Sequence, residues 1–75
     1  MPVERPLDAL NQARGKSVYV NLKNGREVRG KLIAFDIHLN LVLEDAEELE
    51  AGDVKRKLGR VLIRGDTVVM VAPSE

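Results

Sequence analysis

After Gly15, runs of apolar side chains recur at every second position, and this spacing restricts the chain to a β fold. In the first run, Val18, Val20 and Leu22 share one face of an extended segment. The Asn24-Gly25 pair that follows is typical of a tight hairpin, because both residue types tolerate positive φ. We therefore expect short antiparallel strands joined by turns.

The alternation predicts five strands, at about residues 17–22, 26–35, 39–45, 58–63 and 67–72. Gly30 lies in the middle of the second strand, which indicates a sharp bend or a close approach of two backbones. We place Ala34 on the inner face of the second strand and Leu39 on that of the third. The polar residues 46–57, acidic first and basic last with Gly52 in the middle, are expected to form the tip of a hairpin that connects two strands.

A short amphipathic helix is predicted before the strands, at about residues 6–14. Pro6 stands at its first position, Asp8 in its first turn, and Gly15 just beyond its end. Leu7 and Leu10 form a narrow apolar stripe that we expect to lie on the barrel. The predicted fold class is mainly β, with this helix followed by a strongly bent five-stranded antiparallel barrel.

The last predicted strand is apolar on both faces, because Val68, Val69, Met70 and Val71 are consecutive. A strand of this kind aggregates when it is left exposed at a sheet edge. A 75-residue chain without cysteine also has no disulfide to stabilise it, and it buries only about 60% of its unfolded surface. We therefore expect a homo-oligomer, in which a neighbouring copy covers this strand.

The net charge is zero, but acidic residues dominate the middle of the chain and basic residues its two ends. A general cationic surface for polyanions is therefore disfavoured, and a nucleic acid would have to bind in local pockets. The acidic run from Glu44 to Asp53 is expected to be a solvated loop. No apolar stretch approaches the ~20 residues of a membrane helix, so we expect a cytoplasmic protein without a membrane partner.

Two polar islands interrupt the apolar pattern, at residues 36–40 and at residues 63–66. If the first island is extended, its alternate residues project from one face. The two islands hold a planar ring, an amide and a guanidinium, the groups that sandwich an unstacked base and read its edge. The candidate binding residues are Asp36, His38, Asn40, Arg64, Gly65 and Asp66.

Asn40 is the candidate base reader, because a primary amide can accept a base N–H through its oxygen and donate to a base carbonyl through its nitrogen. A flipped amide would suit a base with the opposite pattern, so another group must fix it; Asp66 is the first candidate and Asp36 the second. His38 and Arg64 are expected to stack on opposite faces of the base. Gly65 is expected to supply a turn and a backbone N–H for the base or a phosphate.

Plainer roles remain open for the same residues. Asn40 is often a turn-closing residue, and His38, Arg64 and Asp66 are ordinary surface residues when taken singly. An enzyme is a further alternative, with Asp36, His38 and Asp66 as ligands of a metal-dependent nuclease or as an acid–base pair. Such a site requires more ligands and a protected cleft, so we expect no enzymatic activity, no metal and no cofactor. A purely structural assembly module is the third alternative.

Taken together, these motifs resemble the Sm and Sm-like (LSm) family, most closely its archaeal-type members. The first Sm motif would span about residues 18–49 and the second about residues 58–71, within a single domain at 1–75. The matching positions are Asn24-Gly25, Gly30, Asp36-x-His38-x-Asn40, Leu58-Gly59 and Arg64-Gly65-Asp66. Many eukaryotic members carry Phe or Tyr at the position of His38, and the histidine looks like the archaeal variant.

The resemblance implies a ring of seven subunits, in which the fourth strand of one barrel pairs with the fifth strand of the next. It also implies that uridine-rich single-stranded RNA binds around the central pore, with one base per subunit. The expected role is that of an RNA chaperone or scaffold in RNA processing, with RNA-processing proteins as further partners. The residues themselves leave a ring of six or of seven open.

Overall fold

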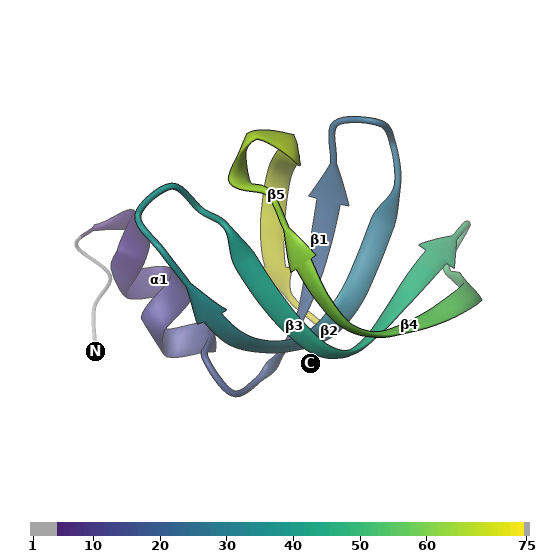
Figure 1. The fold of residues 1–75 in the computed structure, drawn as a ribbon, viewed down its shortest axis with the longest axis horizontal. Helices are drawn as coiled ribbons and strands as arrows, with labels where there is room; N and C mark the ends of the chain where they lie inside the picture. The colour runs from purple at the N-terminus through teal and green to yellow at the C-terminus, as the bar shows by residue number, and fades with distance from the viewer. Residues whose placement is uncertain (1–4, 75) are drawn as a thin grey trace.

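The computed structural model describes residues 5–74, which form one helix and five strands (Figure 1). Residues 1–4 and 75 of the predicted domain lie outside the described residues. The elements are α1 (Pro6–Ala13), β1 (Ser17–Leu22), β2 (Glu27–Phe35), β3 (Leu41–Glu50), β4 (Asp53–Ile63), the 3-10 turn η1 (Gly65–Thr67) and β5 (Val68–Pro73). The strands form one antiparallel sheet in the order β4-β3-β2-β1-β5. The predicted fold class is therefore confirmed.

Helix α1 lies at one end of the sheet and is held by local capping (Figure 1). The Asp8 carboxylate accepts the Arg5 backbone N–H at 3.1 Å, so it satisfies a donor at the start of the helix. Gly15, with φ of 83°, follows the helix end and turns the chain into β1. Leu10 is buried, and Leu7 packs against the same core, as the apolar stripe predicted.

The hairpin between β1 and β2 is confirmed, but its turn differs from the predicted one. Only Gly25 adopts positive φ, at 83°, whereas Asn24 uses its side-chain oxygen to accept the Arg26 N–H at 2.9 Å. The Gly25 N–H donates to the Leu22 carbonyl oxygen at 3.0 Å. This pattern is the three-residue hairpin loop with a bulge at glycine, rather than a two-residue turn.

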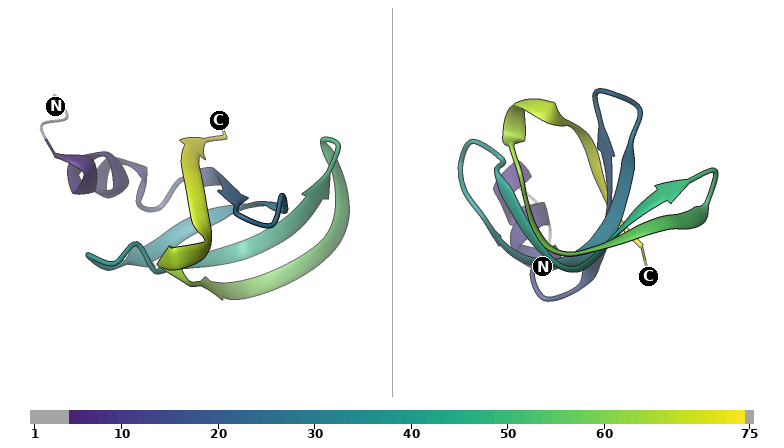
Figure 2. Two further views of the ribbon diagram at one scale, coloured as in Figure 1. Left: turned by 90° about the horizontal axis from the view of Figure 1, so that it is seen from above. Right: turned by 45° about the vertical axis from the view of Figure 1, so that its right-hand side comes forward.

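The sheet bends along a line of small residues that crosses three strands. A Cβ on Gly30 of β2 would lie 3.0 Å from Ala46 Cα of β3, so the two backbones approach as closely as glycine permits. Ala46 pairs in turn with Gly59 of β4, where φ is 74° and the register shifts. Figure 2 shows β3 and β4 curving together along their length. The predicted close approach at Gly30 is confirmed.

Two inward-facing assignments were wrong, because bulges shift the alternation. Ala34 is exposed, since the register of β2 against β3 slips between Leu32 and Ala34 and brings Phe35 onto the core instead. Leu39 lies in a turn before β3 and is 40% exposed. The side chains that are fully buried are Val18, Val20, Leu32, Leu41 and Leu43.

The hairpin predicted at residues 46–57 is confirmed, but most of these residues belong to strand, as the end of β3 and the beginning of β4. Only Ala51 and Gly52 form the turn between them, both with positive φ. Ala46 and Leu49 are buried, because a strand turns one of its faces toward the core. The residues of a solvated loop would face water instead. The solvated loop expected for the acidic run was therefore wrong: the run is mainly strand, and it buries one of its carboxylates, that of Glu48.

Cross-strand ion pairs neutralise this acidic strand. Glu48, with a side chain only 5% exposed, accepts from Arg56 of β4 at 2.9 Å and lies 3.6 Å from Arg26 of the first hairpin. The Arg56 hydrogen bond holds the pKa of Glu48 below its usual range. Arg60 of β4 pairs with Glu44 in the same way. The acidic residues of β3 and basic residues from other parts of the sequence thus lie next to one another in the sheet.

The two outer strands, β4 and β5, carry exposed apolar side chains. On β5, Val69 is 65% and Met70 46% exposed, which confirms that this strand is apolar on both faces. On β4, Leu62 is 69% exposed and Leu58 is exposed as well. Within residues 5–74, each of these strands pairs with a neighbour on one side only, since they stand at the two ends of the sheet order.

Candidate functional site

The first polar island is a tight turn between β2 and β3, not the extended segment that the alternation predicted. The Leu39 N–H donates to the Asp36 carbonyl oxygen at 3.0 Å, and the Asp36 N–H donates to the Asn40 carbonyl oxygen at 3.2 Å. Leu39 reaches positive φ, at 64°, to close the turn. Residues 36–40 are therefore brought together by turn geometry rather than by strand alternation.

The Asp36 carboxylate organises this turn from within. Its Oδ1 accepts the backbone N–H groups of His38 at 2.9 Å and Asn40 at 3.2 Å. Its Oδ2 accepts the side-chain Nδ2–H of Asn40 at 3.0 Å. These bonds, that from the Asn40 amide foremost, hold the pKa of Asp36 below its usual range. Asp36 thus remains an acceptor for the amide across the neutral pH range.

The second island docks onto the first through Gly65. Thr67 closes a turn by donating its N–H and its hydroxyl to the Arg64 carbonyl oxygen, at 3.0 and 2.7 Å. The Gly65 N–H then points at the first island and donates to Asn40 Oδ1 at 2.7 Å. A Cβ on Gly65 would lie 1.8 Å from the His38 carbonyl oxygen, so only glycine permits this contact. In the structure this N–H donates to Asn40, so its expected contact with a base or phosphate stays a prediction.

The Asn40 amide is held at both ends by groups of opposite hydrogen-bonding character. Its nitrogen faces the Asp36 carboxylate, an acceptor, and its oxygen faces the Gly65 N–H, a donor. A flipped amide would place like groups together at both ends, so only one orientation satisfies the network. The expectation that Asp66 fixes the amide was wrong, and the second candidate, Asp36, does so.

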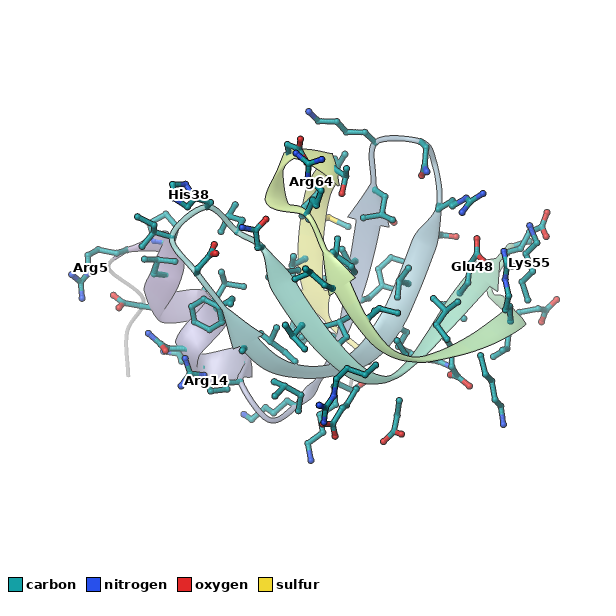
Figure 3. All side chains as sticks on the ribbon, viewed as in Figure 1. Arg5, Arg14, His38, Glu48, Lys55 and Arg64 are labelled. Atoms are coloured by element: carbon teal, nitrogen blue, oxygen red, sulfur yellow. The ribbon has the colours of Figure 1, made fainter. Side chains whose placement is uncertain are left out.

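The two islands line one open, shallow hollow at the surface. Figure 3 shows His38 and Arg64 along the same edge of the molecule. The Arg64 side chain is 77% exposed, and its guanidinium pairs with Asp66 at 3.2 Å. Asp36 is exposed but is not among the residues that line the hollow, and it bonds to the Asn40 amide. The lining residues are His38, Asn40, Arg64, Gly65 and Asp66.

The chemistry of the hollow suits a flat polar group. A histidine ring and a guanidinium offer two planar faces, and the amide offers one further acceptor lone pair and one further N–H between its fixed contacts. Across residues 5–74, we find no group of three or more His, Cys, Asp or Glu side chains placed to hold a metal ion. In the same part of the chain, no helix is long and apolar enough to cross a membrane.

Sequence reasoning named every residue that lines the hollow but missed how the residues are connected. The signal for Asp36 was present, because an aspartate commonly caps the N–H two residues ahead, here that of His38. Sequence reasoning also missed Thr67, whose hydroxyl closes the Arg64 turn. Ser and Thr make such local bonds often enough that Thr67 was identifiable as a turn residue.

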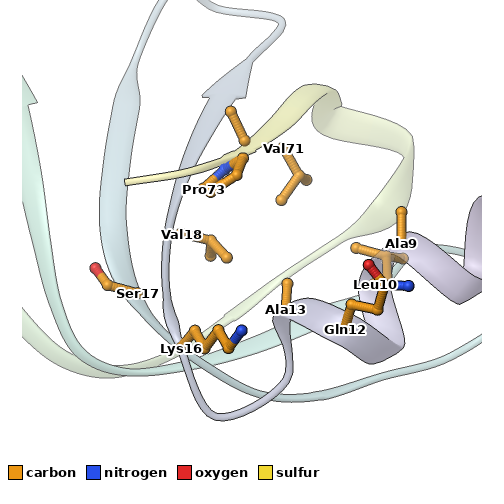
Figure 4. A pocket seen from close by; sticks show the side chains of 10 residues that line it. Ala9, Leu10, Gln12, Ala13, Lys16, Ser17, Val18, Val71 and Pro73 are labelled. Carbon is orange, nitrogen blue, oxygen red and sulfur yellow. The ribbon is translucent and has the colours of Figure 1, made fainter. Parts of the chain in front are cut away.

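A second, apolar cavity lies between α1 and the edge strand β5 (Figure 4). Its walls come from one face of α1, from the start of β1 and from the end of β5. The side chains around it include Ala9, Leu10, Ala13, Val18 and Val71, with Lys16 and Gln12 as polar neighbours. It shares no residue with the polar hollow, so we treat the two as separate features.

Comparisons with known proteins match almost the whole chain. The LSM domain family matches residues 8–73. A putative snRNP Sm-like protein of Archaeoglobus fulgidus is 60% identical over 70 residues, which cover 93% of this chain and 91% of the relative. The corresponding protein of Methanococcoides burtonii is 58% identical, over 92% of this chain and 96% of the relative.

Solved structures match as well. The Pyrococcus abyssi Sm protein in complex with a uridine heptamer superimposes with a TM-score of 0.90 at 49% identity, over 95% of this chain and 100% of that one. A heptameric archaeal Sm protein superimposes with a TM-score of 0.85 at 43% identity, over 91% of this chain and 98% of that one. Identity at this level, together with the fold, relates the chains by descent as well as by shape.

Proposed function

The chain belongs to the LSM domain family, and we propose that it forms a ring that binds uridine-rich single-stranded RNA in the hollow at His38, Asn40 and Arg64. The observation that carries this proposal is the fixed Asn40 amide between two planar side chains. The uridine heptamer bound by the Pyrococcus abyssi Sm protein supports the same ligand here.

Uracil fits the free positions of the amide. Its N3–H can donate to the second lone pair of Asn40 Oδ1, and its O4 can accept the second N–H of Nδ2. His38 and Arg64 stack on the two faces of the base, a contact worth about 1–3 kcal/mol per base for aromatic side chains. Asp66 pairs with Arg64 at 3.2 Å and so restrains the guanidinium beside the hollow. Asp36 and Gly65 contribute by holding Asn40.

Ring formation follows from the two unpaired sheet edges. The heptameric archaeal Sm neighbour supports a closed ring of the same size. In this ring the exposed edge of β4, with Leu58 and Leu62, adds to the exposed edge of β5 in the next subunit, with Val69 and Met70. The apolar cavity beside β5 lies next to this edge, so the neighbouring strand would also cover part of it. Each ring then repeats the hollow once per subunit.

We further propose that the ring acts in the cytoplasm as a chaperone or scaffold in RNA processing, without a catalytic step of its own. A hollow that holds a base by stacking and by one amide provides affinity and selection, but it offers no activated nucleophile. Proteins that process RNA are the expected further partners. The proposed binding sites of all subunits face one RNA strand, which favours holding the strand over cutting it.

Incubation with a labelled uridine heptamer tests this function. We expect the oligonucleotide to be retained, with higher affinity than a cytidine heptamer of the same length, and to keep its full length on a denaturing gel. The variant Glu50→Gln, at the β3–β4 hairpin and outside the lining of the hollow, serves as the control and should bind as the native protein does. Shortening of the RNA would instead establish a nuclease, and no retention would leave an assembly module.

A further inference from the structure

Thr67 closes the turn that carries Arg64 and Gly65, two residues that line the polar hollow. Thr67 is not itself among the lining residues, and it is exposed. Its hydroxyl donates to the Arg64 carbonyl oxygen at 2.7 Å, and its backbone N–H donates to the same oxygen at 3.0 Å. The contribution of this side chain therefore comes from a hydrogen bond rather than from packing in the core.

The Arg64 carbonyl and the Gly65 N–H belong to one peptide group. A trans peptide group is planar, so its C=O and its N–H point in opposite directions. Thr67 bonds to the oxygen of this group, while the N–H of the same group donates to Asn40 Oδ1 at 2.7 Å. The peptide plane is thus held from both sides, and a rotation of the plane would break both contacts.

Thr67 is anchored in its turn to the first hairpin. Its carbonyl oxygen accepts the Lys23 N–H at 2.8 Å, and Lys23 follows directly after β1. The turn that Thr67 closes also joins β4 to β5, the two strands at the ends of the sheet order. An anchored Thr67 therefore supports the peptide group against movement of either outer strand.

We propose that Thr67 is a positioning residue for RNA binding, because its hydroxyl fixes the peptide group that places the Arg64 guanidinium and the Gly65 N–H at the hollow. This inference rests on the proposed function and adds a residue that acts without lining the hollow. A site that is already ordered binds more tightly, since less conformational freedom is lost on binding. A loosened peptide group would also weaken the hold on the Asn40 amide.

Two variants separate the hydroxyl from the rest of the side chain. Thr67→Val keeps the shape and removes the hydroxyl, whereas Thr67→Ser keeps the hydroxyl and removes the methyl group. In Thr67→Val the backbone N–H can still donate to the Arg64 carbonyl oxygen, so the turn keeps one of its two closing bonds. Tyr19→Phe is the matched control, because it removes a hydroxyl from β1 outside the lining of the hollow.

The first readout is the affinity of assembled rings for uridine heptamer, measured by fluorescence anisotropy well below the melting temperature. We expect Thr67→Val to lower this affinity by about tenfold or more, since one hydrogen bond is lost at every hollow. Thr67→Ser and Tyr19→Phe should bind as the native ring does. Native affinity in Thr67→Val rings would overturn the inference, as would an equal loss in Thr67→Ser. Failure of Thr67→Val to assemble would overturn it too, because the hydroxyl would then serve assembly.

The second readout needs no RNA. Hydrogen exchange of the Gly65 backbone amide, followed by NMR on the free ring, reports how firmly this peptide group is held. We expect exchange about fivefold faster in Thr67→Val, the factor that corresponds to one ordinary hydrogen bond, and a native rate in Thr67→Ser. An unchanged rate in Thr67→Val would overturn the inference. If exchange follows this pattern but the native ring does not bind uridine heptamer, the proposed function fails and the support of the turn by Thr67 stands.

Discussion

The backbone N–H of Gly65 donates to Asn40 Oδ1 at 2.7 Å, and this bond joins two turns that lie 25 residues apart. The same glycine lies so close to the His38 carbonyl oxygen that a Cβ would come within 1.8 Å of it. The contact therefore needs a residue without a side chain. It explains why the Arg64-Gly65-Asp66 and Asp36-x-His38-x-Asn40 patterns occur together, since each completes the other.

Gly65→Ala should separate the two turns. The new methyl group cannot share space with the His38 carbonyl, so we expect a loss of stability of about 1–3 kcal/mol and loss of uridine binding. Denaturant unfolding and anisotropy measure the two effects. The comparison variant is Gly52→Ala, at the distant β3–β4 turn. Its new methyl group meets no atom within 4 Å, but the alanine has to adopt the positive φ that glycine has there. It should cost about 1–2 kcal/mol and leave binding intact, which contrasts with the Gly65 variant.

Asn40→Ala should remove the preference for uridine more than it weakens binding to RNA in general. The lost pair of base contacts should cost about 1–3 kcal/mol per site, and repetition around a ring enlarges the effect on a heptamer. Competition between uridine and cytidine oligonucleotides measures the preference. If the variant still favours uridine by the native ratio, then Asn40 is not the reader.

Stacking at His38 should matter more than bulk charge. His38→Phe keeps a flat ring and should retain most of the affinity, whereas His38→Ala should lose the stacking contribution of about 1–3 kcal/mol per base. A plot of the logarithm of affinity against the logarithm of salt concentration should have a slope below one per nucleotide. Among residues 5–74, Arg64 is the only lysine or arginine that lines the hollow, and each phosphate neutralised contributes about 0.7 to the slope. A steep slope, or equal Phe and Ala variants, would place the RNA on another basic surface.

Acid should weaken the fold through Glu48. The Arg56 hydrogen bond lowers its pKa in the folded state, so the stability it contributes is present above the ordinary glutamate pKa and is lost as the pH falls through the lowered value. The lowered pKa of Asp36 acts in the same direction. We expect a melting temperature that is steady from pH 7 to about 5 and declines below about pH 4.3.

Glu48→Gln tests the source of this decline. It should lower the melting temperature at pH 7 and make the acid decline shallower, since one of the two responsible carboxylates is gone. Glu50→Gln is the matched control on the same strand, because its side chain is 71% exposed and its pair with Lys55 spans 3.8 Å. A control that destabilises as much as Glu48→Gln would show that burial at Glu48 has no special role.

The sequence predicted those parts of the fold that depend on local chemistry. The helix caps, the Asn24-Gly25 hairpin and the buried alternation of β1 follow from residues that are near neighbours in the chain. The acidic strand could not be found this way, because the partners that neutralise Glu48 come from β4 and from the first hairpin. Ala34 and Leu39 were misplaced because a bulge or a positive φ shifts alternation without a reliable local signal.

The candidate site shows the same division. Its lining residues could be predicted from their types, because few other patterns combine a ring, an amide and a guanidinium. Which carboxylate holds the amide could not be predicted, since Asp36 and Asp66 are chemically identical and only the turn at residues 36–40 brings the Asp36 carboxylate to the Asn40 amide. The sequence pattern suggested that residues 36–40 are extended, and an extended segment would have kept the Asp36 carboxylate away from the Asn40 amide.

We propose above that copies of this chain close into a ring whose hollows bind one uridine-rich strand. Native mass spectrometry of the protein with a uridine heptamer tests it most directly. We predict a complex with seven times the 8.3 kDa chain mass that also carries one uridine heptamer. The substitution Val69→Lys, on the exposed edge of β5, should dissociate this complex into smaller species. A stable monomer at micromolar concentration would contradict ring formation. A ring that takes up a cytidine heptamer equally well would contradict binding that is selective for uridine.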